Sequence, residues 1–165
     1  MGMEVIDVLL SLVFSGGEFM SLINTVGIIK RELYRDCVVF VKVGAFYNVY
    51  FKDAVIVSYL FGYKLKMLDG DVENCGFPEV SLKNVKFLLG EKRISYIVID
   101  EARDYEGHNG ERFFDENFYD KCYEEAFLVI SNRRRIEAIN KVLLEKADRP
   151  EIGGILDEIE SCFLK

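Results

Sequence analysis

The sequence predicts an α+β fold, in which a mixed β-sheet flanked by helices is followed by a C-terminal helical hairpin. Three observations lead to this prediction. The 165-residue chain is 50% hydrophobic, which is enough to bury a core of ordinary domain size. Strand-like segments rich in β-branched residues, at 38–43 and 94–99, alternate with segments of helical apolar spacing. From residue 118 onward the spacing is helical, with a break around Pro150.

The N-terminal part of this fold begins with a helix that runs to Leu33, for which Ser21 or Asn24 is the candidate N-cap. The strand at 38–43 follows, and a Gly-Ala pair interrupts it. Residues 46–51 are mostly aromatic, with one valine, and predict a second strand. We expect the two strands to pair with one another.

A helix and a short strand come next. Asp53 is the predicted N-cap of a helix over 54–61, and Gly62 is well placed to end it. Residues 63–67 alternate between apolar and basic side chains and predict a strand.

The last part of the sheet module contains a predicted turn at 75–78, with further strand pairing near Cys75 as an alternative. Ser81 is the predicted N-cap of a helix over 82–89. The strand at 94–99 then closes the module, and its apolar run predicts that it is largely buried.

The remaining residues are predicted to be helical after a polar, glycine-containing linker at 101–117. Asn117 can cap a long helix, and Arg149-Pro150 interrupts the pattern, with the proline suited to the first turn of a second helix. The apolar positions of the two helices are Tyr119, Tyr123, Ala126, Phe127, Ile130, Ile136, Ile139, Val142 and Leu143, then Ile152, Ile155, Leu156, Ile159 and Phe163.

Charge supports a division of the chain into segments 1–19, 20–100, 101–117 and 118–165. The first segment carries three acidic residues and no basic one. The second is mildly basic, with eleven Lys and Arg against nine Asp and Glu. Residues 101–165 are acidic, with sixteen acidic residues against ten basic ones. This asymmetry suggests two modules with different partners.

Residues 1–19 stand apart from this pattern. The apolar run at 8–14 follows acidic residues, which argues against a secretory signal peptide. A short helix is one interpretation, and a hinge at Gly16-Gly17 is another. A third interpretation is that Met20 is the natural start, because the preceding residues back-translate to a purine-rich, ribosome-binding stretch. A nucleotide sequence without such a stretch would rule out this third interpretation.

Composition excludes several classes of function. The net charge of −7 argues against a broadly basic nucleic-acid coat protein. The sequence has no phosphate-binding loop motif, no apolar stretch of membrane-spanning length and one histidine, His108, which we interpret as a surface residue. The four cysteines show no Cys-x-x-Cys spacing, as is typical of reduced thiols in a cytoplasmic protein. We therefore expect neither catalysis nor a cofactor or metal.

Four short motifs occur in order within Val39–Asp100. They are Gly44–Tyr50 after the first strand, Asp53-Ala54 at a helix start, Gly76-Phe77-Pro78 at a turn, and the helix and strand at 81–90 and 94–99. Together they resemble domain I of MutS, the mismatch-recognition domain of DNA repair, over about half of the chain. The ATPase, clamp and lever domains of a repair MutS would need several hundred more residues.

The resemblance implies a binding chemistry for individual residues. Phe46 matches the phenylalanine that wedges beside a mispaired base, where a weakly stacked step kinks at low cost. Asn48 occupies the position of a glutamate that hydrogen-bonds the displaced base. Ala45 replaces an aspartate of the family motif, and Val80 replaces a histidine. These departures affect mismatch specificity more than the fold.

Alternatives remain for each predicted contact. An aromatic residue in an alternating strand is commonly part of the core, so Phe46 is either a core residue or the exposed probe. Lys42, Lys64 and Lys66 are the predicted phosphate contacts. The alternative for these lysines is a solvated surface balanced by acidic residues.

The C-terminal hairpin is the predicted protein-binding part, although it could instead cover the sheet. Its predicted partner contacts are Tyr123, Phe127, Arg133, Arg134 and Arg135. The three arginines could also contact phosphate, or pair with Glu137 and neighbouring acidic residues.

Two classes of function follow. The first is a non-enzymatic module that binds mismatched or distorted duplex DNA or an RNA–DNA hybrid. By resemblance to short, free-standing MutS-like proteins, its partner would be a reverse transcriptase of a diversity-generating retroelement. The second is a protein-interaction adaptor that keeps the fold and has lost nucleic-acid binding. An exposed Phe46 ring flanked by basic residues would favour the first class, and a buried ring the second.

Overall fold

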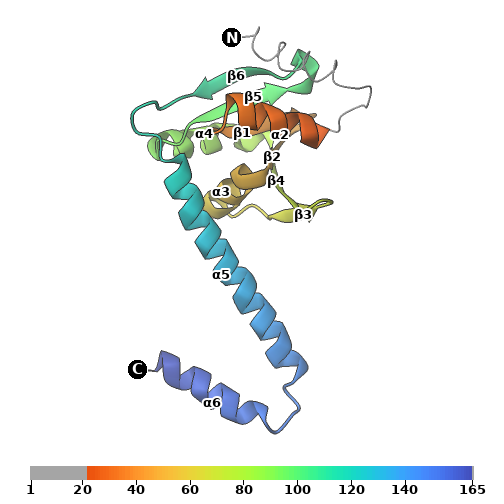
Figure 1. The fold of residues 1–165 in the computed structure, drawn as a ribbon, viewed down its shortest axis with the longest axis vertical. Coiled ribbons are helices and arrows are strands. Elements are labelled where there is room, and N and C mark those ends of the chain that lie inside the picture. The colour runs from red at the N-terminus through yellow and green to blue at the C-terminus, as the bar shows by residue number, and fades with distance from the viewer. Residues whose placement is uncertain (1–21, 165) are drawn as a thin grey trace. The chain divides into compact units, whose positions relative to one another are not determined.

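The structure is a computed structural model that describes residues 22–164 (Figure 1). The chain divides into two compact units, one ending at Phe127 and one beginning at Leu128, which are described separately below. The predictions for residues 1–19, for a start at Met20 and for a cap at Ser21 lie outside the described residues.

The first unit contains a six-stranded mixed sheet in the order β3-β4-β2-β1-β5-β6. β1 and β5 are parallel, and the other neighbours are antiparallel. The sheet confirms the predicted α+β fold, including the pairing of the first two strands. The strands are β1 (Val38–Val43), β2 (Phe46–Tyr50), β3 (Lys66–Leu68), β4 (Val72–Pro78), β5 (Tyr96–Asp100) and β6 (Glu106–Glu111).

Helices cover both faces of the sheet (Figure 1). One face packs against α3 (Phe51–Phe61), α4 (Leu82–Glu91) and the first turns of α5 (Tyr119–Glu145). The other face packs against α2 (Leu22–Leu33). The alternation of β1 explains this arrangement, because Val38 and Phe40 belong to the first core and Val39 and Val41 to the second. Two 3₁₀-helices complete the unit, η1 (Glu79–Ser81) and η2 (Glu101–Arg103).

Residues 75–78, predicted as a turn, are the end of strand β4, which pairs along the whole of β2. The prediction was wrong because Gly-Phe-Pro is typical of a turn. Here Cys75 and Phe77 are buried in the core, and Gly76 lies beside Asn48 on the opposite face. The alternative of strand pairing near Cys75 is confirmed. The strand predicted at 63–67 is shorter and begins only at Lys66.

Residues 106–111, interpreted as part of a linker, form the edge strand β6 against β5. The composition is polar because one face of an edge strand is solvated. The glycines permit close approach, since a side-chain carbon on Gly110 would come within 2.7 Å of the Tyr96 carbonyl oxygen.

The predicted helix ends were partly correct. Gly62 ends α3 in the left-handed conformation, with φ of 71°. The Asn117 side-chain oxygen accepts a hydrogen bond from the Tyr119 N–H at the start of α5. Ser81 makes no capping hydrogen bond at α4. Asp53 is not the N-cap of α3 but lies in its first turn, where it is buried.

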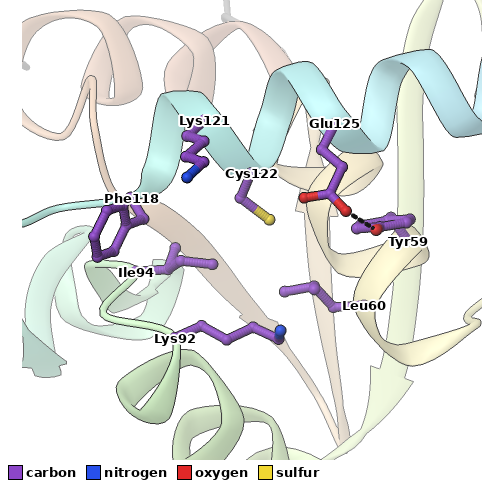
Figure 2. A pocket seen from close by; sticks show the side chains of 8 residues that line it. All are labelled: Tyr59, Leu60, Lys92, Ile94, Phe118, Lys121, Cys122 and Glu125. Carbon is purple, nitrogen blue, oxygen red and sulfur yellow. Dashed lines mark hydrogen bonds between the residues drawn. The ribbon is translucent and has the colours of Figure 1, made fainter.

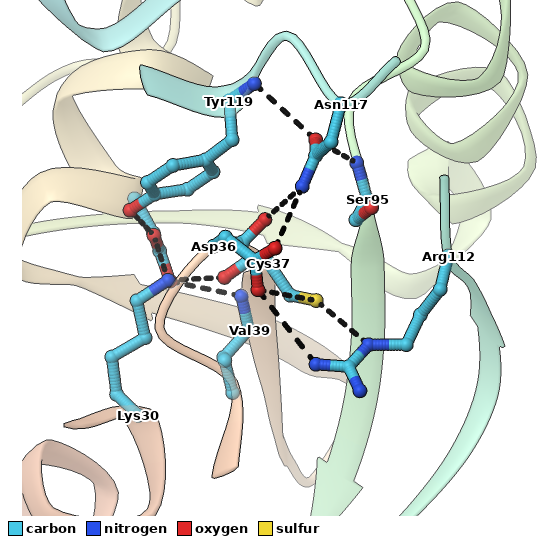
Figure 3. Close-up of polar contacts among 9 residues, drawn as sticks. Lys30, Asp36, Cys37, Val39, Ser95, Arg112, Asn117 and Tyr119 are labelled. Carbon is cyan, nitrogen blue, oxygen red and sulfur yellow. Dashed lines mark hydrogen bonds and ion pairs between the residues drawn. The ribbon is translucent and has the colours of Figure 1, made fainter. Parts of the chain in front are cut away.

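The buried Asp53 carboxylate joins four elements. It forms an ion pair with Lys30 of α2 at 2.8 Å and accepts hydrogen bonds from the Val39 N–H of β1 at 2.9 Å and the Tyr119 hydroxyl of α5 at 2.5 Å. Figure 3 shows Lys30, Val39 and Tyr119 converging on this point. Burial raises the pKa of Asp53, although Lys30 and the hydrogen bonds oppose that shift. The start of α5 is therefore part of the first unit.

A second polar cluster fixes the chain on either side of β5 (Figure 3). The Asn117 amide accepts from the Ser95 N–H at 3.2 Å and donates to the Asp36 carbonyl oxygen at 2.7 Å. Arg112 donates to Cys37 Sγ at 3.3 Å and lies 3.7 Å from the Asp36 carboxylate. These contacts hold the segment between β6 and α5 against the sheet.

The second unit contains the rest of α5 and helix α6 (Ile152–Phe163), which are the two helices predicted for the C-terminal part. None of the α6 residues is buried. Beyond Ile130, the α5 residues Ile136, Ile139, Val142 and Leu144 are exposed as well.

Candidate nucleic-acid interface

The turn between β1 and β2 presents Phe46 at one end of the sheet. Gly44 has φ of 61°, a conformation that glycine adopts without strain, and it lets the chain reverse within two residues. Val43 and Phe46 pair across the turn. The Phe46 side chain is 55% exposed, so the interpretation of Phe46 as a core residue is wrong.

The alternation of β2 explains this exposure. Tyr47 and Val49 point into the core, where the Tyr47 ring stacks on Phe77 with centroids 5.8 Å apart. Phe46, Asn48 and Tyr50 therefore share the opposite face. Tyr50 is buried beneath α2. Phe46 is four residues earlier in the strand, about 13 Å away along its axis, where the strand leaves the cover of the helix.

Phe46 belongs to a small exposed apolar group, here called the apolar tip and comprising Val43, Phe46, Pro78 and Val80. Pro78 pairs with Phe46 across the β2–β4 ladder. The Glu79 N–H donates to the Ala45 carbonyl oxygen at 2.9 Å, which fixes the turn against η1. Val80 is 86% exposed. The tip is therefore an exposed apolar group at one end of the sheet.

Asn48 lies beside the apolar tip on the same face of the sheet as Phe46. It pairs with Val41 on one side and Gly76 on the other, and its side chain is half-buried. A side-chain carbon on Gly76 would come within 3.0 Å of the Asn48 amide oxygen. The glycine therefore leaves room for the Asn48 amide at this face.

The three lysines predicted to contact phosphate do not form one patch. Lys42 lies at the same sheet end as Phe46 but on the other face, beside Tyr47 and Asp100. Its ammonium pairs with Glu79 at 3.3 Å, and that hydrogen bond raises the pKa of Lys42. Lys66 shares the face of Phe46 at the far edge of the sheet, and Lys64 is exposed in the segment before β3.

Sequence reasoning missed one exposed aromatic residue, which lies outside the apolar tip. Phe87 of α4 is 69% exposed and follows Lys83 by one helical turn, in the helix that begins directly after η1. The buried face of α4 is formed by Val85 and Leu89. An aromatic residue off the apolar face of an amphipathic helix was the signal that could have identified Phe87.

The predicted protein-binding residues are divided between the two units. Tyr123 is half-buried against the core, with the Lys52 ammonium 4.7 Å from its ring centroid. Phe127 is exposed, and its ring centroid is 5.9 Å from that of Tyr123. The three arginines at 133–135 are exposed in the second unit.

A cavity of about 490 Å³ lies between α3 and the start of α5 (Figure 2). Lys92, Lys121 and Cys122 line it, and the Tyr59 hydroxyl donates to Glu125 at 2.5 Å on its rim. Burial raises the pKa of Cys122 to about 11, so its thiol is protonated at neutral pH and is a poor nucleophile. This cavity gives no support to thiolate catalysis.

A second cavity of about 710 Å³ lies beside α2. Its basic lining residues are Lys30, Arg31, Arg35 and Lys52, and Phe51 contributes an aromatic ring. Lys30 is already paired with Asp53, and Arg31 with Glu32 at 2.8 Å.

Metal-binding clusters and membrane-spanning helices are both absent from residues 22–164. No group of three or more His, Cys, Asp or Glu side chains is arranged to hold a metal ion there. None of the helices in that range combines the length and apolar character needed to span a bilayer.

The first unit is thus an α+β sheet module that presents an exposed aromatic side chain at one end of the sheet. Residues 22–104 match the family described as MutS domain I, and this match covers half of the chain. The chain belongs to the MutS domain I family, as the sequence motifs predicted. That domain is a DNA-binding recognition domain without ATPase activity. No curated protein matches the chain.

Proposed function

We propose that the protein binds mismatched or otherwise distorted duplexes, with Phe46 as the wedge beside the unpaired base. The exposed Phe46 ring at the β1–β2 turn of a MutS domain I fold carries this proposal. Insertion of an apolar side chain must break the stacking of one base step. A mispaired step is already weakly stacked, so the insertion costs less there than in a perfect duplex.

Asn48 supplies the polar contact that follows the wedge. It lies two residues from Phe46 on the same face of β2, about 7 Å along the strand. Its amide both donates and accepts hydrogen bonds, so it can contact either a donor or an acceptor group on a displaced base. Asparagine carries no charge, and we therefore expect broad recognition of distortion rather than selection of one mispair.

Lys42 can contact a phosphate group only after it leaves Glu79, because the two side chains are paired. A phosphate group must compete with that carboxylate. We expect Glu79→Gln to strengthen binding to perfect and mismatched duplexes by the same factor, since phosphate contacts carry no sequence information. Lys64 and Lys66 are proposed as outer phosphate contacts.

The biological duplex that we propose is one with frequent mispairs, such as an RNA–cDNA hybrid made by a reverse transcriptase. The reverse transcriptase itself would contact Tyr123, Phe127 and the arginines at 133–135. We also propose that the protein is cytoplasmic and has no enzymatic activity. The resemblance to short MutS-like accessory proteins supports the proposed association with a reverse transcriptase.

Fluorescence anisotropy tests the proposal with three labelled ligands: a perfect duplex, the same duplex with one mismatch, and an RNA–DNA hybrid. We expect tighter binding to the mismatched duplex, and Phe46→Ala should reduce that binding by about tenfold, as for the loss of one stacked base. Phe87→Ala is the matched control, because Phe87 is an exposed phenylalanine outside the tip. Equal binding of perfect and mismatched duplexes by the native protein would contradict the wedge.

A second candidate is a protein adaptor that keeps the fold without binding nucleic acid. The pairing of Lys42 with Glu79 and the net charge of −7 favour it. Absence of duplex binding at low salt, by both the native protein and Glu79→Gln, would select this alternative.

A further inference from the structure

Helix α6 carries an apolar stripe that residues 22–164 leave uncovered. Ile152, Ile155, Leu156, Ile159 and Phe163 recur at three- and four-residue intervals and so share one face of the helix. Leu156 is 40% exposed and Phe163 is 84% exposed. A stripe of this size on a soluble helix is typical of an interaction surface.

The second unit contains another uncovered stripe, on the part of α5 beyond Leu128. Ile136, Ile139 and Leu143 share one face of α5 by the same spacing. Ile136 and Ile139 are both more than half exposed. One short unit of the chain therefore presents two apolar helix faces to solvent.

The charges beside these two stripes are opposite in sign. The α5 stripe is flanked by Arg133 on one side and Arg135 on the other, as the helical period places them. The α6 stripe is flanked in the same way by Glu158 and Glu160. Helix α6 has three acidic residues and no basic one between Ile152 and Phe163. Each stripe is thus complementary to the other in both hydrophobicity and charge.

We propose that the occupant of these stripes is a second copy of this chain. In the dimer, α6 of each copy packs on α5 of the other, which gives two equivalent contacts related by a two-fold axis. Flanking charges of opposite sign specify such helix pairs in the same way as the e and g positions of coiled coils. This inference does not depend on the proposed binding of nucleic acid.

Charge reversal tests the pairing directly in the full chain. Sedimentation equilibrium of the native protein should show a monomer–dimer equilibrium. Arg133→Glu/Arg135→Glu should raise the dimer dissociation constant by about tenfold or more, because acidic stripes then face one another. Glu158→Arg/Glu160→Arg should have the same effect, because basic stripes face one another.

A mixture of these two double variants distinguishes pairing between copies from pairing within one chain. In the heterodimer, the reversed α5 of one variant meets the reversed α6 of the other. The second contact joins two native helices. Both contacts therefore have opposite charges, and a heterodimer should form. The matched control is the pair of single reversals Lys141→Glu and Asp157→Arg, which lie on the same helices away from the stripes and should leave dimerisation unchanged. Circular dichroism confirms that all variants retain their helices.

Two results would overturn the proposal. One is a native protein that stays monomeric at concentrations of about 100 μM, well above the dissociation constant of a weak specific dimer. The other is a native dimer whose stability is unaffected by either double reversal, which would place the interface elsewhere.

Discussion

Replacement of Lys30 by methionine should destabilise the first unit strongly. Lys30 is the only cationic side chain paired with Asp53 among residues 22–164, at 2.8 Å, and Asp53 is 2% exposed. Methionine keeps most of the side-chain volume but removes the charge. An uncompensated buried charge typically costs 3–5 kcal/mol. Because the Val39 N–H and the Tyr119 hydroxyl still donate to the carboxylate, we expect a loss of about 3 kcal/mol, at the lower end of that range.

The loss is measured by urea unfolding followed by circular dichroism, or as a drop in Tm of about 6–12 °C for a chain of this size. Arg31→Met is the matched control, since Arg31 is exposed and, within the described part of the chain, its ion pair is with the neighbouring Glu32. That variant should change stability by less than about 0.5 kcal/mol. A Lys30→Met protein within 1 kcal/mol of native stability would refute the reasoning.

The same variant should acquire a pH dependence of known sign. The pKa of folded Asp53 is raised above its usual value of 3.8, and loss of Lys30 raises it further. The Asp53 carboxyl group therefore loses its proton at a lower pH in the unfolded chain than in the folded protein. Stability of Lys30→Met should therefore fall as pH rises from about 4 towards neutrality, more steeply than in the native protein. Asp53→Asn in the same background should remove this slope.

Three further predictions concern glycine and cysteine residues. Gly62→Ala should cost about 1 kcal/mol of unfolding free energy, because Gly62 is in the left-handed region, whereas Gly153→Ala in α6, where the added carbon meets open space, should not destabilise the protein. Iodoacetamide at pH 8 should label exposed Cys162 rapidly and leave Cys75 and Cys122 unlabelled until unfolding. The reason is that burial raises the pKa values of Cys75 and Cys122 to about 12 and about 11. Equal labelling rates would contradict the burial of these two thiols. Gly110→Val should displace β6, because the added carbon would crowd the Tyr96 carbonyl, and hydrogen exchange should then lose β6 protection while β1 keeps it.

The central strands could be predicted from sequence because an apolar, β-branched composition is typical of buried strands. Four of the six residues of Val38–Val43 are valines, and the strand lies in the middle of the sheet. Strand β6 could not be predicted, since a polar, glycine-containing edge strand has the composition of a loop and depends on β5 to order it. Its pairing is a tertiary effect without a local signal.

The candidate site residues follow from the family motif, but their arrangement in space does not. The family motif pointed to Phe46, and its exposure depends on where α2 stops covering β2, which no local pattern determines. Asp53 was interpreted as a cap because aspartate favours that position. The distant residues Lys30 and Tyr119 give it a buried structural role instead.

The insertion of Phe46 beside a mispaired base is tested most directly by measuring how protein binding changes the stacking of the neighbouring base. A 2-aminopurine placed next to the mismatch reports this stacking by its fluorescence. Saturation with the native protein should change the fluorescence beside the mismatch and leave the matched duplex unchanged. Saturation with Phe46→Ala should give no change, while Phe87→Ala behaves like the native protein. An unchanged signal with saturating native protein, or an equal change with Phe46→Ala, would contradict the wedge.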